Sequence, residues 1–169
     1  MDALEAILSR RSVRKFSGEP ISDSDIKKIL EAAMAAPSAR NQQPWHFILV
    51  KDKEQLGRLS EANPYARMVK EAAVAIVVCG DLDLERSKGF WPIDCANASQ
   101  NILLAAHALG LGAVWTALYP REDRVAGARN VLGLPENIIP LNIIPIGHPA
   151  EKKEPEQRYD EKRIHTDRW

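Results

Sequence analysis

The sequence is poor in the residues that bind structural metals or form disulfides. It holds only two cysteines among 169 residues, Cys79 and Cys95, and neither lies in a CxxC pair or near a histidine at metal-ligand spacing. Cys79 ends an apolar, strand-like run and Cys95 lies in an alanine-rich helical stretch, so both are expected to be reduced core thiols of an intracellular protein. A disulfide scaffold and a zinc site built on cysteine pairs are thereby excluded, and no metal is expected.

The sequence also lacks a long apolar run. No stretch approaches the roughly 20 apolar residues that cross a bilayer. The first ten residues, MDALEAILSR, have an acidic second position and no apolar core of the kind that a secretory signal needs. A cytoplasmic protein without a membrane partner is therefore expected.

Net charge is absent as well, because 23 Lys and Arg residues balance 23 Asp and Glu residues. A net charge of zero provides no overall field that would attract nucleic acid, so any anion must be bound by a local cluster of cations. The length fits one domain over residues 1–169, and apolar residues make up 45% of the chain, enough to bury a core without disulfide or metal support.

Residues 10–16, RRSVRKF, form such a cluster, with four cations and one hydroxyl in seven residues. Guanidinium groups carry forked donors that suit phosphate oxygens, and Ser12 adds a compact donor beside them. A basic segment of this kind also fits a solvated surface. A second stretch, residues 36–45 with the sequence APSARNQQPW, is dense in amide and hydroxyl groups and favours the binding-site interpretation. We expect the chain to be organised around these two loops.

Apolar spacing and turn residues divide the chain into helices and strands. The helix near the middle should be the most buried element, because its apolar residues wrap nearly all round. The last strand carries Pro140 and Pro145, which fit an edge strand or an irregular one. Helices are expected over residues 2–9, 22–36, from 52 onward with Leu56 and Leu59 on the inner face, 93–109 and 121–132, and strands over residues 45–50, 73–79, 113–119 and 138–146.

The C-terminal tail has a different composition. Residues 151–163, EKKEPEQRYDEKR, hold almost no apolar residue, which is typical of a segment that cannot contribute to a core. The tail nevertheless ends in Ile164, His165 and Trp169, and a terminal tryptophan suggests that it docks across another surface.

Four motifs occur in order along the chain: RRSVRKF at residues 10–16, APSARNQQPWHFILV at 36–50, NILLAAHALGLGAVWT at 101–116 and IIPIGHP at 143–149. Each resembles the corresponding motif of the FMN-dependent nitroreductase family, of the short type without a large helical insertion, over essentially the whole chain. The resemblance implies an α+β fold with a central, mainly antiparallel sheet surrounded by helices. It also implies an intertwined homodimer whose C-terminal tail, about residues 150–169, embraces the partner, with FMN in each cleft at the subunit interface.

The resemblance assigns cofactor-binding roles residue by residue. Arg10 and Ser12 match positions that hold the FMN phosphate and ribityl chain, with Arg11 beside them, and Arg158 matches a late arginine that returns to the phosphate. Arg14 matches a cation near the pyrimidine edge of the isoalloxazine. A positive charge there would stabilise the two-electron-reduced flavin, which is an anion at neutral pH, and so tune the ring.

Two further segments match flavin contacts of the family. Pro37, Ser38 and Asn41 match a loop that reaches the flavin of the other subunit, although Ala39 stands where the family often has a second serine. The segment that matches the stretch near the flavin ring is Trp115, Thr116, Ala117 and Leu118, of which the first three are the cofactor-binding candidates.

The function implied is an NAD(P)H-dependent FMN oxidoreductase. Hydride would pass from NAD(P)H through flavin N5 to a nitroaromatic, quinone or similar electron-poor acceptor by a ping-pong mechanism, without an obligatory protein acid or base. Two alternatives stay open: specialised flavin chemistry, such as reductive dehalogenation or flavin fragmentation, and a non-catalytic module that binds FMN or phosphate. The family's dehalogenating members use an added helical lid, whereas one short helix is expected between Lys51 and Ala73.

Several other polar and aromatic residues have a structural interpretation. Asp94 fits a helix-start carboxylate favoured by the helix dipole better than a catalytic acid. Phe90 and Trp91 fit either an aromatic lip over the flavin or a packed loop. The four histidines have no cysteine or carboxylate partner at a telling spacing and are expected to be structural: His46, His107, His148 and His165.

Overall fold

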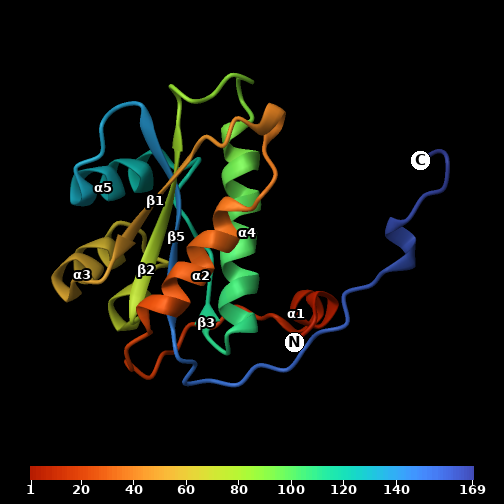
Figure 1. The fold of residues 1–169 in the computed structure, drawn as a ribbon, viewed down its shortest axis with the longest axis horizontal. Coiled ribbons are helices and arrows are strands. Elements are labelled where there is room, and N and C mark those ends of the chain that lie inside the picture. The colour runs from red at the N-terminus through yellow and green to blue at the C-terminus, as the bar shows by residue number, and fades with distance from the viewer.

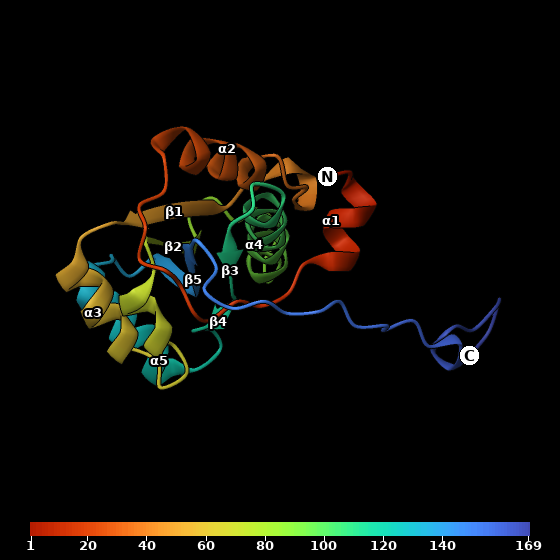
Figure 2. The same cartoon turned by 90° about the horizontal axis from the view of Figure 1, so that it is seen from below.

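A five-stranded sheet lies between two pairs of helices in the computed structural model, which describes residues 1–169 (Figures 1 and 2). The strand order is β1-β2-β5-β3, β4 also pairs with β5, and every pair is antiparallel. The strands are β1 (Trp45–Val50), β2 (Val74–Asp81), β3 (Gly112–Ala113), β4 (Thr116–Ala117) and β5 (Ile138–Gly147). The helices are α1 (Ala3–Ser9), α2 (Asp23–Met34), α3 (Lys53–Glu61), α4 (Trp91–Ala108) and α5 (Glu122–Leu132), with 3-10 turns η1 (Ala39–Asn41), η2 (Arg67–Glu71) and η3 (Glu161–Arg163).

Local sequence signals set the helix starts. Ser22 accepts a hydrogen bond from Asp25 N at the start of α2, and Asp52 accepts one from Gln55 N at the start of α3. These caps satisfy backbone N–H groups that have no partner inside the helix. Leu56 and Leu59 are fully buried, which confirms the predicted inner face of α3.

The sheet has a separate apolar core on each face (Figure 2). The larger core lies under α2 and α4 and includes Ile29, Ile76 and Ile102. The smaller lies under α3 and α5 and includes Leu59 and Val77. Neighbouring residues of β2 thus point into different cores, because side chains alternate across a strand. The α+β prediction is confirmed.

The most buried element is β2, and the prediction that the central helix would be the most buried is wrong. All eight residues of β2 are buried, whereas α4, which begins at Trp91 instead of residue 93, leaves Ile93 exposed. An interior strand is covered by helices on both faces and by strands on both edges, but α4 is covered mainly where it meets the sheet and α2.

The strand expected over residues 113–119 is broken, and β5 is an interior strand. β3 and β4 are two-residue segments that pair with β5 on either side of Ile144 and Pro145. Pro140 lies where the β2–β5 register shifts, between Val78 and Cys79. Proline has no N–H group to donate to a neighbouring strand. β5 can still be an interior strand because its pairing with a neighbouring strand is interrupted at each of the two prolines. Of the two alternatives predicted for this strand, the irregular strand is confirmed and the edge strand is wrong.

The tail leaves the body beyond the end of β5 and extends away from it (Figures 1 and 2). Residues 152–169 are all exposed, and Trp169 stacks on His165 within the tail itself, with ring centroids 4.2 Å apart. None of the helices combines the length and the apolar character that a membrane crossing requires.

Candidate functional site

The arginine segment lies against the sheet directly after α1. Ser12 forms a parallel bridge with Ala113, and Val13 N donates to Ala113 O at 3.1 Å. Gly112 makes this approach possible, since a Cβ there would lie 2.6 Å from Val13 Cγ1. The backbone of residues 12–13 is therefore fixed by the sheet, and the arginines on either side project from a rigid support.

Arg10 lies in a cleft of about 580 Å³ between α1 and the tail, together with Arg11 and Arg158. Its half-buried guanidinium donates no hydrogen bond within the chain, and burial, followed by repulsion from Arg11 and Arg158, lowers the pKa of Arg10. A guanidinium without an acceptor beside two further cations fits an anion, because an anion would supply the missing acceptors and offset the repulsion.

The other predicted phosphate ligands differ in the hydrogen bonds that their side chains already form within the chain. Arg11 donates to four backbone carbonyls, those of Leu8, Arg10, Glu154 and Glu156, and so ties the tail to the end of α1. Arg158 pairs with Glu156 at 3.0 Å on the exposed rim. Ser12 keeps its hydroxyl free of any partner, while its carbonyl accepts from Lys153 Nζ at 2.7 Å.

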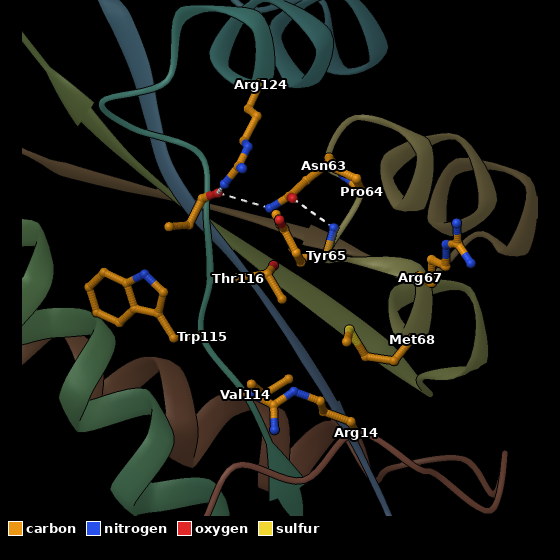
Figure 3. A pocket seen from close by; sticks show the side chains of 11 residues that line it. Arg14, Asn63, Pro64, Tyr65, Arg67, Met68, Val114, Trp115, Thr116 and Arg124 are labelled. Carbon is orange, nitrogen blue, oxygen red and sulfur yellow. Dashed lines mark hydrogen bonds between the residues drawn. The ribbon is translucent and has the colours of Figure 1, made fainter.

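A second cavity, of about 530 Å³, brings Arg14 together with the predicted ring-contact residues (Figure 3). The Arg14 guanidinium has no acceptor within the chain, and its backbone N donates to Glu151 Oε1 at 2.6 Å. That backbone bond is the main cause that lowers the pKa of Glu151. The predicted residues that line this cavity are Arg14, Trp115, Thr116 and Ala117.

The segment 115–117 offers mainly backbone to the cavity. Thr116 Oγ1 donates to Ile143 O at 2.6 Å, so the hydroxyl proton is directed into the sheet. Ala117 O accepts from Asn63 Nδ2 at 2.9 Å and from Arg124 at 3.4 Å, and Figure 3 shows both side chains reaching this segment. Arg124 also lies 5.2 Å from the centre of the Tyr65 ring.

Sequence reasoning missed one side of this cavity. The connection between α3 and η2 supplies Asn63, Pro64 and Tyr65 to its wall, and the first two residues of η2 supply Arg67 and Met68. The Asn-Pro dipeptide marked a turn, but nothing in the sequence indicated which surface that turn faces. Tyr65 is 71% exposed, an unusual position for a large ring, and stands at the rim.

The two cavities fit the two ends of one elongated ligand. Arg10 and Arg14 are four residues apart, so an extended chain separates their Cα atoms by at most about 14 Å. One end offers the unpaired guanidinium of Arg10, beside Arg11 and Arg158, for a phosphate. The other offers backbone, apolar atoms and cations, including the unpaired guanidinium of Arg14, for a ring system. The residues present therefore fit a phosphate-bearing aromatic cofactor.

Pro37, Ser38 and Asn41 do not join this site within one chain. Their loop lies at the N-terminal end of α4, where Asn97 Nδ2 donates to Pro37 O at 3.3 Å (Figure 1). The arginine segment lies at the other end, where His107 contacts Ser9, the last residue of α1, at 2.7 Å. α4 has 18 residues, which corresponds to about 27 Å of helix.

The remaining candidates occupy structural positions. Trp91 is buried against Gly80, where a Cβ would lie 2.2 Å from the indole, so Trp91 belongs to a packed core, whereas Phe90 is exposed. Cys79 and Cys95 are both buried and unpaired, and burial raises the pKa of Cys79 to about 12, which keeps this thiol protonated and unreactive.

Fold and site together define an α+β protein with a cation-lined cleft and a second cavity suited to a ring, connected by the arginine segment that lies along the sheet. The family model described as Nitroreductase family matches residues 7–63 and 60–148. A protein of Methanothermobacter thermautotrophicus named "Putative NADH dehydrogenase/NAD(P)H nitroreductase" is 53% identical over 169 residues, which cover 100% of this chain and 88% of the relative. The chain belongs to the nitroreductase family, and the resemblance is confirmed.

Solved structures agree with this assignment. The structure of a protein of the same name from Parabacteroides distasonis superposes with a TM-score of 0.94 at 49% identity, covering 98% of each chain. An FMN-dependent nitroreductase from Clostridium difficile superposes with a TM-score of 0.91 at 31% identity, covering 98% of this chain and 99% of its own. Both matches extend over the whole fold, including the strands that support the site.

Proposed function

We propose that this protein is an FMN-dependent oxidoreductase that passes hydride from NAD(P)H to nitroaromatic, quinone or similar electron-poor acceptors by a ping-pong mechanism. Family membership and the names of the relatives confirm the coarser prediction, an NAD(P)H-dependent oxidoreductase that uses a flavin. The choice of FMN is supported by the C. difficile relative, which is named an FMN-dependent nitroreductase. The observation that carries the proposal is that both cavities contain a guanidinium of the arginine segment without an acceptor, Arg10 in one and Arg14 in the other.

Each end of the site would hold one part of the cofactor. Arg10, Ser12 and Arg158 would hold the phosphate and the ribityl chain, because Arg10 and Arg158 line the cleft and Ser12, whose hydroxyl has no partner, follows directly after Arg11 in its wall. Arg11 would support them by fixing the tail, given its bonds to Glu154 and Glu156. The exposed rim position of Arg158 allows it to exchange Glu156 for a phosphate.

The ring would lie in the second cavity. Bound FMN supplies hydride transfer at N5, and the protein binds, orients and tunes it. The backbone of Trp115, Thr116 and Ala117 would position the ring, since Ala117 O is fixed by two donors. Arg14 would hold a positive charge close to the ring, which favours electron uptake.

A second copy of this chain would complete the site. Pro37, Ser38 and Asn41 lie at the opposite end of α4 from the arginine segment, so they reach a flavin only if it is bound by another subunit. The exposed tail, residues 152–169, supports the same arrangement because it extends beyond the body of its own subunit. The homodimer would carry FMN at the subunit interface.

An anaerobic absorbance spectrum tests the function. The purified protein, incubated with FMN and freed of excess, should show flavin bands that bleach on addition of one equivalent of NADPH or NADH. Bands that persist with both donors would contradict the oxidoreductase and favour a specialised or non-catalytic flavin protein. No bands at all would leave an anion-binding module.

Arg14→Ala separates tuning from binding. It should slow flavin reduction about tenfold, corresponding to about 1.4 kcal/mol of lost transition-state stabilisation, while FMN is retained. Arg14→Lys keeps the charge and should recover most of the rate. Stopped-flow bleaching measures both, and equal rates in wild type and Arg14→Ala would contradict the assigned role.

A further inference from the structure

A buried carboxylate at the start of α4 has no cationic partner. Asp94 is 2% exposed, Oδ1 accepts from Ala39 N at 2.9 Å, and Oδ2 accepts from Gln42 Nε2 at 2.6 Å. Burying a charge is costly unless it is paired or fully hydrogen-bonded. The helix dipole accounts for a carboxylate in the first turn. It does not account for two bonds to a loop more than 50 residues earlier in the chain.

Gln42 extends this connection to a third segment. The side chain is 4% exposed, and Oε1 accepts from Ser87 N at 2.9 Å while Nε2 donates to Asp94. The amide is therefore fixed at both ends, because a flip would place its NH2 group against the N–H of Ser87. Asp94 and Gln42 together join the loop 36–44 to the segment that leads into α4.

The loop held in this way has an unusual backbone. Arg40, Asn41 and Gln43 have φ values of 50°, 52° and 47°, and none of them is glycine. Non-glycine residues adopt a left-handed backbone conformation only where the surrounding structure stabilises it, and such residues concentrate at functional sites. Ser38 Oγ accepts from Gln43 N at 2.9 Å, which stabilises the same turn from within.

We infer that Asp94 is a positioning residue that holds residues 38–43 in the conformation, with positive φ at Arg40, Asn41 and Gln43, in which Pro37, Ser38 and Asn41 are presented to the flavin of a second copy. Gln42 is the second member of this device. The presentation to a flavin rests on the proposed function, whereas the holding of the loop stands on the hydrogen bonds alone.

The hydrogen-bond pattern provides a rescue experiment. Asp94→Asn keeps the shape but places an amide NH2 group against that of Gln42, so two donors face each other. Gln42→Glu in the same chain replaces the Gln42 donor with a carboxylate oxygen that accepts from the new amide, while the other carboxylate oxygen accepts from Ser87 N as Gln42 Oε1 does. Asn97→Ala is the matched control, because Asn97 reaches the same loop from the same helix through one longer, exposed bond.

Hydrogen exchange in the cofactor-free protein measures how firmly the loop is held. The N–H groups of Ala39, Asn41, Gln42 and Gln43 are all hydrogen-bonded. In Asp94→Asn these amides should exchange about tenfold faster, because a charge-assisted bond is lost, and β2 should keep its protection as a check of folding. FMN affinity, measured by fluorescence titration, should fall about tenfold. The double variant should restore both quantities, and Asn97→Ala should change neither by more than about twofold.

The possible outcomes test the holding role, the presentation to the flavin and the proposed function separately. Unchanged exchange in Asp94→Asn, or loss that the double variant does not restore, would overturn the holding role. Faster exchange that is restored, with FMN affinity constant throughout, would overturn the presentation to the flavin. If wild type itself binds no FMN, the proposed function fails, and the exchange rates still decide whether Asp94 holds the loop.

Discussion

The polar groups near the two ends of α4 differ in whether they have hydrogen-bond partners. Near the C-terminal end, the guanidiniums of Arg10 and Arg14 have no acceptor, although the backbone between them is fixed to the sheet. At the N-terminal end, Asp94 and Gln42 have every bond matched and hold a left-handed loop. Unmet hydrogen-bonding capacity attracts a ligand, whereas matched capacity fixes a shape. One end of the helix therefore supplies binding energy and the other supplies geometry.

Among the substitutions that test this comparison, Gly112→Ala is expected to have the largest effect on stability and FMN binding. A Cβ would lie 2.6 Å from Val13 Cγ1 and 2.8 Å from its Cβ, so the arginine segment must move off the sheet. Overpacking of this kind costs about 1–3 kcal/mol of unfolding free energy, and the displaced Arg10 should lose most of its hold on FMN. Urea unfolding and FMN titration measure the two effects.

Gly57→Ala is the matched control for that substitution. Gly57 lies inside α3 with no atom within 4 Å of the added methyl group, so the variant should be as stable as wild type or up to about 1 kcal/mol more stable. Wild-type stability in Gly112→Ala would show that the arginine segment is not held by this close contact.

Removing the unpaired charge should have the next largest effect. Arg10→Ala deletes charge-assisted bonds to a phosphate, and FMN affinity should fall about 10- to 100-fold with little change in stability. Lys27→Ala, on the exposed face of α2, should leave affinity within about twofold. Riboflavin lacks the phosphate, so it should bind equally to wild type and Arg10→Ala. A preference of riboflavin for wild type would place Arg10 at another part of the ligand.

His107→Gln should have the smallest effect, visible as a pH dependence. His107 packs against Ser9, and burial followed by the charges of Arg10 and Arg11 lowers its pKa in the folded protein, with Glu5 acting in the opposite sense. Because the unfolded histidine binds a proton more readily, this group reduces folding stability as pH falls below about 6.5, down to the folded pKa. Above that range the group is neutral in both states.

Unfolding midpoints of the wild type between pH 8 and pH 5 should therefore include a decline that His107→Gln removes. His148→Gln serves as the histidine control, since His148 follows β5 beside Ser17 and lines neither the cleft of Arg10 and Arg11 nor the contact with Ser9. Identical pH profiles for wild type and His107→Gln would contradict the linkage between His107 and the arginine cluster.

The sequence allowed the local parts of this structure to be predicted. The bounds of β1 are those expected, and Ser22 and Asp52 cap the helices that their positions indicated. Such signals act within a few residues, so they can be read directly from the chain.

Long-range pairing was the part that could not be predicted. The interior place of β5 depends on the short partners β3 and β4, and the prolines alone fitted either an edge strand or an irregular one. Asp94 resembled an ordinary helix-start carboxylate because its partners, Ala39 and Gln42, are 55 and 52 residues away. The positive φ angles of Arg40, Asn41 and Gln43 could not be predicted, because no glycine in the loop indicates them.

The interrupted pairing beside β5 bears on how this protein avoids aggregation. A strand from a foreign chain needs a continuous row of free N–H and C=O groups to extend a sheet, and such rows are the template for fibril growth. At the β3–β4 border of the sheet, two pairs of residues separated by Val114 and Trp115 replace that row. The prolines of this interior strand thus leave the border without a continuous docking ladder, and residues 12–13 already pair with Ala113 there, so another chain has no row of free groups on which to extend the sheet.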